Sequence, residues 1–269
     1  MRSEFKSSRP KKSLGQSFLR DNRIIEKIID SCQFGRHDTV LEIGPGHGEL
    51  TGKILEHSGR VIVVEIDSGL CEALDKNLGS SENLEIINRD ILKFDINKYF
   101  KSCSGKIRVI GNIPYYITTP IIEHLFVYLG KIEDIFLTVQ KEFARRIVSS
   151  PGSREYGSFS CFTQYHTDPR LLFYIKKGSF HPSPKVDSAF LRLKVRNKPA
   201  VEVLDEVLLF KIIRRAFNQR RKKITNSLKG IVTPQALESF FLRYGLDREV
   251  RPERLSLQDF ANLANLISC

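Results

Sequence analysis

The sequence predicts an α/β fold, in which a doubly wound, mostly parallel sheet is followed by a small helical domain. Strand-like and helix-like segments alternate from residue 22 to residue 139, which favours parallel strands joined by helical crossovers. The strands are continuous apolar runs, which indicates that both faces of the sheet are covered. From Asp205 onward, apolar residues recur at helical spacing.

The first helix is expected over 22–34, where four isoleucines lie at helical spacing. We predict buried strands at 39–43, 61–64, 84–87, 107–110 and 135–139. Helices are expected between them, at 50–56, 68–77 and 121–129. Two further strands, at 171–177 and 189–195, flank the rigid segment Phe180-His181-Pro182-Ser183-Pro184. These two strands are expected to be antiparallel neighbours, because their link is too short for a crossover.

The pattern changes after Arg196-Asn197-Lys198-Pro199, where we place a domain boundary. Residues 1–198 are assigned to the first domain and residues 199–269 to the second. The second domain is expected to be helical to its end, with turns near Gly230, Thr233 and Gly245.

Composition limits the class of protein. With 269 residues, 41% of them hydrophobic, the chain can bury a substantial core. It has no run of 18 or more apolar residues, so we expect no membrane span. The basic N-terminus lacks the apolar core of a secretory signal, which favours a cytoplasmic protein. The cysteines are scattered singly, so we expect neither a disulfide framework nor a metal site; they are Cys32, Cys71, Cys103, Cys161 and Cys269.

The charge balance is strongly basic. Lys and Arg total 43 against 31 Asp and Glu, which gives a formal charge of +12. A polyanion such as RNA rewards this excess, because each neutralised phosphate releases condensed counterions. Excess charge can also serve solubility alone.

A glycine-rich turn follows the first predicted strand, in the run Glu42-Ile43-Gly44-Pro45-Gly46-His47-Gly48-Glu49. Such a turn lets the backbone approach a ligand closely. Dinucleotide sites require G-x-G-x-x-G, but Glu49 stands at the third glycine position. The form E-x-G-x-G-x-G instead resembles the first motif of S-adenosylmethionine-dependent methyltransferases.

Two carboxylates end the next strands. Glu65 can accept both ribose hydroxyls of a cofactor, and Asp90 can accept its adenine amino group. The alternative is that each residue caps the helix after it. Glu65 alone also fits a nicotinamide cofactor, whereas Glu49 and Asp90 favour S-adenosylmethionine. The predicted cofactor contacts are therefore Gly44, Gly46, Gly48, Glu65, Asp90 and the neighbouring Asn112.

The run Gly111-Asn112-Ile113-Pro114-Tyr115-Tyr116 follows the fourth strand, where a parallel sheet opens into its ligand crevice. The Asn112 side-chain oxygen and the Ile113 carbonyl can accept both hydrogens of an exocyclic amino group such as adenine N6. Those bonds favour a pyramidal nitrogen whose lone pair can attack a methyl group. Pro114 fixes φ and holds the carbonyl outward, and Tyr115 offers a stacking face worth roughly 1–3 kcal/mol. The alternative is an ordinary proline turn.

Four segments occur in a recognisable order: Gly15-Gln16-Ser17-Phe18-Leu19, the glycine turn, Asn112-Ile113-Pro114-Tyr115, and Phe180-His181-Pro182-Ser183-Pro184-Lys185-Val186-Asp187-Ser188. Together they resemble the ribosomal RNA adenine N6,N6-dimethyltransferases, the KsgA family. The resemblance extends from about Lys12 to Gly230. It implies a Rossmann-like class I methyltransferase with a seven-stranded sheet that contains an antiparallel strand.

The resemblance also implies roles for individual residues. Gln16, Ser17 and Leu19 would contact the cofactor, with Ser17 standing where the family more usually has Asn. Phe180 would stack on the face of the target base opposite Tyr115, as expected for a flipped base. Tyr116 stands where the family commonly has Asn, which changes one wall of the pocket.

A cationic segment, residues 211–229, contains no acidic residue. A solvated helix face normally intersperses both signs, so this segment predicts a polyanionic partner. Within it, 217–223 resembles the family's F-x-Q-R-R-K signature, and Phe217 and Ile224 are expected to pack inward. We assign RNA contacts to Arg214, Arg215, Arg220, Arg221, Lys222 and Lys223, with further phosphate contacts from Arg9, Lys11 and Lys12.

Several functions remain open at this point. The first is dimethylation of two adjacent adenosines in a hairpin loop near the 3′ end of small-subunit ribosomal RNA, by a monomer acting on that RNA or on a pre-30S-type subunit. The second is methylation of large-subunit ribosomal RNA in antibiotic resistance, and the third is a non-catalytic assembly or nucleic-acid-binding factor. The segments 184–188 and 219–222 favour the first, and Glu49 disfavours a nicotinamide-dependent dehydrogenase.

Overall fold

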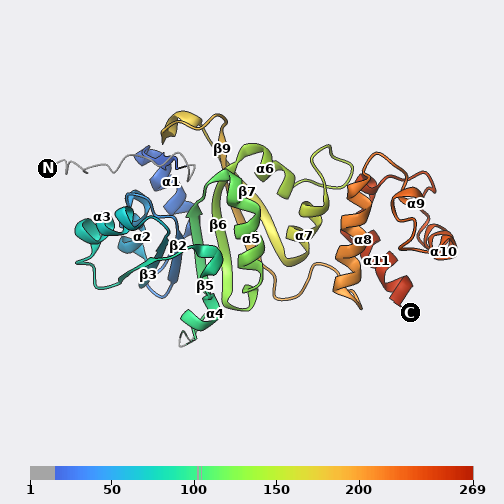
Figure 1. Cartoon of the computed structure of the whole chain (residues 1–269), viewed down its shortest axis with the longest axis horizontal. Helices are drawn as coiled ribbons and strands as arrows, with labels where there is room; N and C mark the ends of the chain where they lie inside the picture. The colour runs from blue at the N-terminus through green and yellow to red at the C-terminus, as the bar shows by residue number, and fades with distance from the viewer. Residues whose placement is uncertain (1–15, 102, 104, 269) are drawn as a thin grey trace. The chain divides into compact units, whose positions relative to one another are not determined.

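The computed structural model describes residues 16–101, 103 and 105–268. Its main sheet has seven strands in the order β4-β3-β2-β5-β6-β9-β7 (Figure 1). Strands β2 to β6 pair in parallel and β9 runs antiparallel to β6, which confirms the predicted mixed sheet. The strands are β2 (Thr39–Ile43), β3 (Arg60–Glu65), β4 (Leu84–Asn88), β5 (Ile107–Asn112), β6 (Ile132–Gln140), β7 (Thr167–Ile175) and β9 (Ser188–Val195).

The strand order reverses at β2. From there β3 and β4 lie on one side, while β5 and β6 lie on the other. In a doubly wound sheet the two crossovers on either side of such a point diverge, and a crevice opens at the carboxyl ends of the strands. The predicted glycine turn follows β2 and the predicted acceptor motif follows β5, so both are placed at this crevice.

Helices cover the sheet as the alternating pattern predicts. Buried isoleucines of α1 share one apolar cluster with α2, α3 and the central strands, whereas α5 lies in front of the sheet in Figure 1. The predicted helix at 121–129 begins earlier, at Thr118, and ends at Phe126, because the chain then turns into a separate short 3-10 helix at Leu129–Lys131. The helices are α1 (Asn22–Cys32), α2 (Glu49–His57), α3 (Ser68–Leu78), α4 (Ile96–Tyr99), α5 (Thr118–Phe126) and α6 (Lys141–Ile147).

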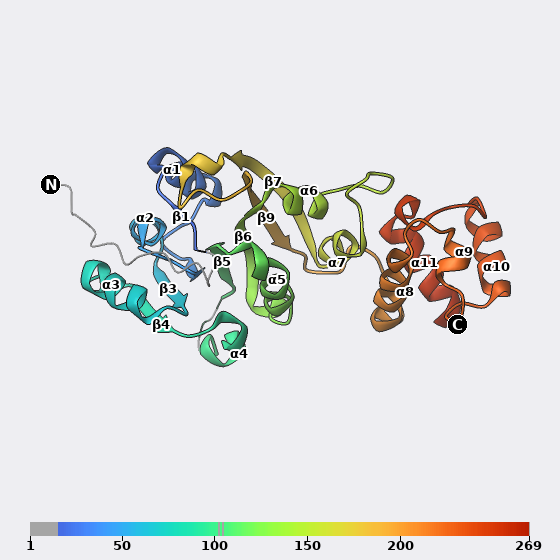
Figure 2. The same cartoon turned by 45° about the horizontal axis from the view of Figure 1, so that its top comes forward.

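A second, two-stranded sheet pairs segments that are far apart in sequence. β1 (Phe18–Leu19) runs antiparallel to β8 (Phe180–His181), with Leu19 opposite Phe180. Figure 2 shows β1 near α2, and the ring of Phe18 in β1 lies against Gly46 of the glycine turn. The pairing brings Leu19, a predicted cofactor contact, next to Phe180, which is predicted to stack on the target base.

The chain divides into two compact units. Among the described residues, the first unit contains those up to Ala144 together with Arg170–Val195, and the second contains Arg145–Pro169 and those from Arg196 onward. The short helix α7 (Ser158–His166), which the sequence analysis did not predict, belongs to the second unit because Cys161 and Tyr165 are buried in its core. The division at Lys198 stays a prediction about where the domains separate.

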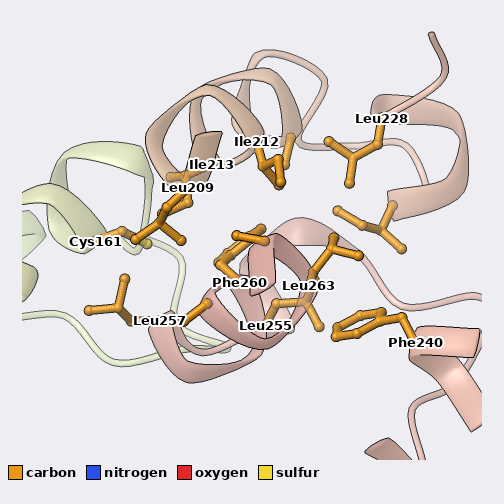
Figure 3. Close-up of a cluster of buried hydrophobic side chains, with 14 of the residues drawn as sticks. Cys161, Leu209, Ile212, Ile213, Leu228, Phe240, Leu255, Leu257, Phe260 and Leu263 are labelled. Carbon is orange, nitrogen blue, oxygen red and sulfur yellow. The ribbon is translucent and has the colours of Figure 1, made fainter. Parts of the chain in front are cut away.

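The second unit is helical, as expected from Asp205 onward. Its core joins Leu209, Ile212 and Ile213 of α8 to Phe260 and Leu263 of α11 (Figure 3). Helix α10 begins and ends at two of the predicted turns, since Thr233 caps it and Gly245 ends it in the left-handed region. The helices are α8 (Glu206–Asn218), α9 (Ile224–Ser227), α10 (Pro234–Tyr244) and α11 (Leu257–Ser268). Along the described chain, no helix combines the length and apolarity needed to cross a membrane.

Candidate active site

A cavity of about 490 Å³ lies in the first unit, at the carboxyl ends of the parallel strands. Its size falls in the range of pockets that bind small molecules and cofactors. The cavity joins both predicted halves of the site, which the sequence places on different strands. The predicted residues that line it are Gln16, Ser17, Leu19, Gly44, Gly46, Glu65, Asp90, Asn112, Ile113, Pro114, Tyr115 and Phe180.

Two glycines of the turn, Gly46 and Gly48, are required by different neighbouring side chains. Gly46 has φ +62°, and a Cβ atom there would lie 2.7 Å from the ring of Phe18, so its absence lets β1 close against the turn. Gly48 has φ +90°, and a Cβ atom there would lie 2.6 Å from Leu74 of α3. Gly48 is not among the residues that line the cavity, so packing against α3 accounts for it.

Glu42, two residues before the turn, is buried and lines the cavity. Its carboxylate accepts a hydrogen bond of 2.7 Å from the Thr51 hydroxyl. Burial raises the pKa of Glu42 to about 8, because removal from water penalises the charged form. Glu49 is the first residue of α2, and burial also raises its pKa. The cavity is therefore bordered by acidic groups next to the turn.

Glu65 ends β3 with its side chain buried. Its Oε1 atom accepts a hydrogen bond of 2.9 Å from the Asp67 backbone N–H. The cap of α3 is Asp67 and not Glu65, since the Asp67 carboxylate accepts from the Gly69 N–H. The capping interpretation is thus wrong for Glu65, whose carboxylate lines the cavity and also interacts with the backbone N–H of Gly46 in the glycine turn.

Asp90 confirms the capping interpretation, and its contact with a cofactor stays a prediction. Its Oδ1 atom caps the short 3-10 helix at Ile91–Lys93 by accepting from the Leu92 N–H at 3.0 Å. That bond leaves Oδ2 for a ligand, and Asp90 lines the cavity. The cap fixes the carboxylate just after the end of β4, beside the cavity.

The acceptor motif is held by the N-terminal segment. The Asn112 amide nitrogen donates a hydrogen bond of 3.0 Å to the Ser17 carbonyl, which leaves the amide oxygen for an amino hydrogen. Pro114 has φ −59° and ψ 137° and precedes the 3-10 helix Tyr115–Ile117. Ile113, which lies between Asn112 and Pro114 in the sequence, is buried. The Asn112 side-chain oxygen and the Ile113 carbonyl oxygen thus come from adjacent residues of a fixed backbone.

Two aromatic rings border the cavity. The Tyr115 hydroxyl lies 2.6 Å from the Ser188 hydroxyl, and burial raises the pKa of Tyr115. Phe180 is 5% exposed and belongs to β8. Both rings line the same cavity, which the predicted two-sided stacking of a base requires.

The sequence analysis missed several residues that line the cavity. Ile66 follows Glu65 and is 53% exposed, so an apolar side chain lies at the cavity rim. Thr138 and Gln140 lie at the carboxyl end of β6. Extending the strand-end rule to the fifth predicted strand could have found these two polar residues.

The lining suits S-adenosylmethionine. The carboxylates of Glu65 and Asp90 provide acceptors for ribose hydroxyls and an adenine amino group, and Ile66 and Ile91 provide apolar contact for a purine ring. The glycine turn allows close approach of a main chain to an amino-acid moiety. Among the residues that the structure describes, no group of three His, Cys, Asp or Glu side chains is arranged to hold a metal ion.

The six RNA contacts predicted in the cationic segment lie in the second unit. Helix α8 ends at Asn218, so Arg214 and Arg215 lie on the helix and the other four cations on the turn after it. Arg220 donates to the Ser153 carbonyl at 3.2 Å, and Lys223 forms an ion pair with Glu249. Arg214, Arg221 and Lys222 are exposed.

The predicted anchors of the cationic segment point inward. Phe217 packs edge-on against Tyr156 at 5.7 Å between ring centroids, and Ile224 is fully buried. The expected phosphate contacts of Arg9, Lys11 and Lys12, and the predicted Gly15, lie outside the described residues.

Comparisons with known proteins identify the family of the chain. Residues 7–268 match the family model described as ribosomal RNA adenine dimethylase. The chain is 44% identical over 263 residues to ribosomal RNA small subunit methyltransferase A of Lachnoclostridium phytofermentans, covering 95% of this chain and 91% of the relative. It is 42% identical to the protein of that name from Francisella tularensis subsp. novicida, covering 97% and 98%.

Solved structures share the whole architecture. A dimethyladenosine transferase from Plasmodium falciparum superposes with a TM-score of 0.78 at 25% identity, covering 91% of this chain and 95% of that one. The 23S rRNA methyltransferase ErmE superposes with a TM-score of 0.74 at 25% identity, covering 94% and 100%. The family model spans nearly the whole chain, and the cavity unites the motifs that carry the resemblance. The chain belongs to the ribosomal RNA adenine dimethylase family.

Proposed function

We propose that this protein transfers methyl groups from S-adenosylmethionine to N6 of two adjacent adenosines in a hairpin loop near the 3′ end of small-subunit ribosomal RNA, and so contributes to ribosome biogenesis. The observation that carries the proposal is the shared cavity. The end of β3, with Glu65, and the end of β5, with Asn112, open into one space of about 490 Å³. A methyl donor and an amino acceptor can therefore meet there.

In this mechanism S-adenosylmethionine supplies an electrophilic methyl group on a sulfonium sulfur. The Asn112 amide oxygen and the Ile113 carbonyl accept the two amino hydrogens of adenine and direct the nitrogen lone pair toward that methyl group. The bond from Asn112 to the Ser17 carbonyl orients the amide for this role. The chain's contribution is mostly positioning, because the amino proton becomes acidic once the methyl group has transferred.

The aromatic residues hold the base. Tyr115 and Phe180 line the cavity on separate segments, and a flipped adenine can stack between two such rings. The cations Arg214, Arg215, Arg220, Arg221, Lys222 and Lys223 would contact RNA phosphates. We propose that the protein acts as a cytoplasmic monomer on the small-subunit RNA or a pre-30S-type particle.

The test measures methyl transfer from labelled S-adenosylmethionine to unmethylated small and large ribosomal subunits, followed by nucleoside analysis. We expect dimethyladenosine in the small subunit and no label in the large one. The large subunit is included as the alternative substrate because a 23S rRNA methyltransferase is similar over 94% of this chain at 25% identity. The small-subunit relatives are favoured by their higher identity of 44% and 42%. Label in the large subunit would overturn the assignment of substrate, and no transfer to either subunit would favour a non-catalytic assembly factor.

A further inference from the structure

Asp187 ends the link from β8 to β9 and Ser188 begins β9. Ser188 is hydrogen-bonded to Tyr115, and Asp187 is hydrogen-bonded to the turn that precedes Phe180. Ser188 is fully buried and is the first residue of β9, where it lies opposite Gln140 of β6. This register fixes the backbone of Ser188 at the carboxyl end of β6. Its hydroxyl lies 2.6 Å from the Tyr115 hydroxyl, within the range of a short O–H···O hydrogen bond.

Asp187 joins the same strand end to the turn before Phe180. Its carbonyl accepts a hydrogen bond of 3.0 Å from the Lys141 N–H, just beyond β6. Its Oδ1 atom accepts a hydrogen bond of 3.0 Å from the Lys177 N–H. Lys177 begins the 3-10 helix Lys177–Ser179, and Phe180 follows this helix directly. The charge of Asp187 also raises the pKa of Tyr115, although burial has the larger effect.

The two bonds restrict different motions. A tyrosine ring held only at Cβ can change its tilt, whereas a hydroxyl bonded to a buried strand residue fixes the far end of the ring. The Asp187 carboxylate holds the first N–H of a short turn, so it fixes the main chain that leads into Phe180. Stacking on both faces of a base requires the two rings to keep a constant spacing.

We propose that Asp187 and Ser188 are positioning residues for the target base: Ser188 sets the plane of the Tyr115 ring, and Asp187 sets the turn that carries Phe180. One pair of adjacent residues thereby fixes the distance between the two rings. The inference rests on the proposed function, because that function assigns the two rings to a flipped adenine.

The Ser188 part is tested by a double-mutant cycle with Ser188→Ala and Tyr115→Phe, which keeps the ring and removes its hydroxyl. Each single variant should lower kcat/KM for the RNA roughly five- to tenfold, and the double variant should lose no more than the worse single one. Cofactor affinity and Tm should stay close to wild type. The control is Ser227→Ala, which removes another buried hydroxyl, bonded to the Ile224 carbonyl in the second unit.

The Asp187 part is tested by comparing Asp187→Asn with Asp187→Ala. Asparagine keeps an oxygen that can accept from the Lys177 N–H, so it should retain most activity, whereas alanine should lose about tenfold. RNA with 2-aminopurine at the target adenosine provides a direct readout, since stacking quenches its fluorescence. Ser188→Ala and Asp187→Ala should both reduce the quenching seen with wild type.

The outcomes separate this inference from the proposed function. If the wild-type protein transfers no methyl group to the small subunit, the proposed function fails. If the wild type is active but the losses of Ser188→Ala and Tyr115→Phe multiply, or the quenching is unchanged in both alanine variants, the positioning role is wrong while the function stands.

Discussion

The cavity and the cationic segment 211–229 serve one proposed reaction but hold their side chains differently. In the cavity, Glu65 and Phe180 are each 5% exposed, and Asn112 is hydrogen-bonded to the main chain of the N-terminal segment. In the cationic segment, Arg214, Arg221 and Lys222 are exposed to solvent. Buried, hydrogen-bonded groups act through position, whereas exposed charges act through their sum. Substitutions should therefore have large, specific effects in the cavity and graded effects in the segment.

The largest effect is expected for Asn112→Ala. Removing the amide oxygen takes away an acceptor that the proposed mechanism uses in the transition state, so the rate of methyl transfer should fall about 100-fold or more. Cofactor affinity, measured by calorimetry, should remain within a few-fold of wild type. A large loss of cofactor affinity with an intact rate at saturation would contradict the assigned role and would place Asn112 with the cofactor alone.

Glu65→Ala should affect the other side of the cavity. Its carboxylate is proposed to accept two ribose hydroxyls, and hydrogen bonds to a charged group contribute about 1.5–3 kcal/mol. The dissociation constant for S-adenosylmethionine should therefore rise about 10- to 100-fold. Glu56→Ala, which removes an exposed carboxylate on α2, is the control. Equal affinities of Glu65→Ala and wild type would exclude the ribose contact.

Glu42 provides a test of burial through pH. Its pKa is higher in the folded protein, about 8, than the ordinary value of 4.5, so the folded state binds more protons between these values. Glu42 contributes fully to the free energy of unfolding below pH 4.5. This contribution decreases as pH rises toward 8. Relative to Glu42→Gln, which does not titrate, the wild type should lose up to about 3 kcal/mol between pH 5 and pH 8. Denaturant titration without cofactor measures this difference, and parallel pH profiles of the two proteins would show that Glu42 is not desolvated.

The smallest effect for each residue is expected in the cationic segment. A variant with Arg214, Arg221 and Lys222 all changed to Gln should bind RNA more weakly, and the slope of log affinity against log salt should fall in magnitude by about 0.7–0.9 for each charge removed. The matched control changes Lys76, Lys98 and Lys106, three exposed lysines of the first unit, to Gln. Equal salt slopes for the two triple variants would mean that the segment has no particular role in RNA binding.

The cations of the segment differ in whether they also form contacts within the second unit. Arg220 donates to the Ser153 carbonyl and Lys223 pairs with Glu249, so both also join parts of the second unit. For this reason the triple variant leaves them intact, and a loss of RNA affinity in it cannot be ascribed to loosening of the fold.

A contrast between local sequence pattern and tertiary contact explains which parts of the fold the sequence could predict. Strands β2 to β6 and the carboxylates at their ends follow from local apolar runs and from the strand-end rule, which needs no long-range information. The short helix α7 was missed because its apolar residues are interspersed with polar ones, and Cys161 and Tyr165 become buried only against α8 and its neighbours. Helix α8 was expected to continue through the Arg220–Lys223 turn, because charge alone carries no signal for where a helix ends.

Within the site, the sequence motifs predicted many of the residues that line the cavity, but not the tertiary contacts that hold these residues in place. The bond from Asn112 to Ser17 joins residues that are far apart in sequence, as does the approach of Tyr115 to Ser188. Gly48 was expected at the cofactor, but its packing against Leu74 of α3 accounts for the glycine. A sequence motif shows which residue types occur at the site. Only the fold shows which neighbouring residues contact them.

The division of roles between the cavity and the cationic segment is tested most directly by single-turnover methyl transfer, measured against the concentration of unmethylated small subunits. Wild type, Asn112→Ala and the triple variant of Arg214, Arg221 and Lys222 are compared with saturating S-adenosylmethionine. We predict that the triple variant reaches the wild-type rate once subunits saturate it, and that Asn112→Ala remains slow at every concentration. A triple variant that stays slow at saturation, or an Asn112→Ala protein that high subunit concentration restores, would contradict this account.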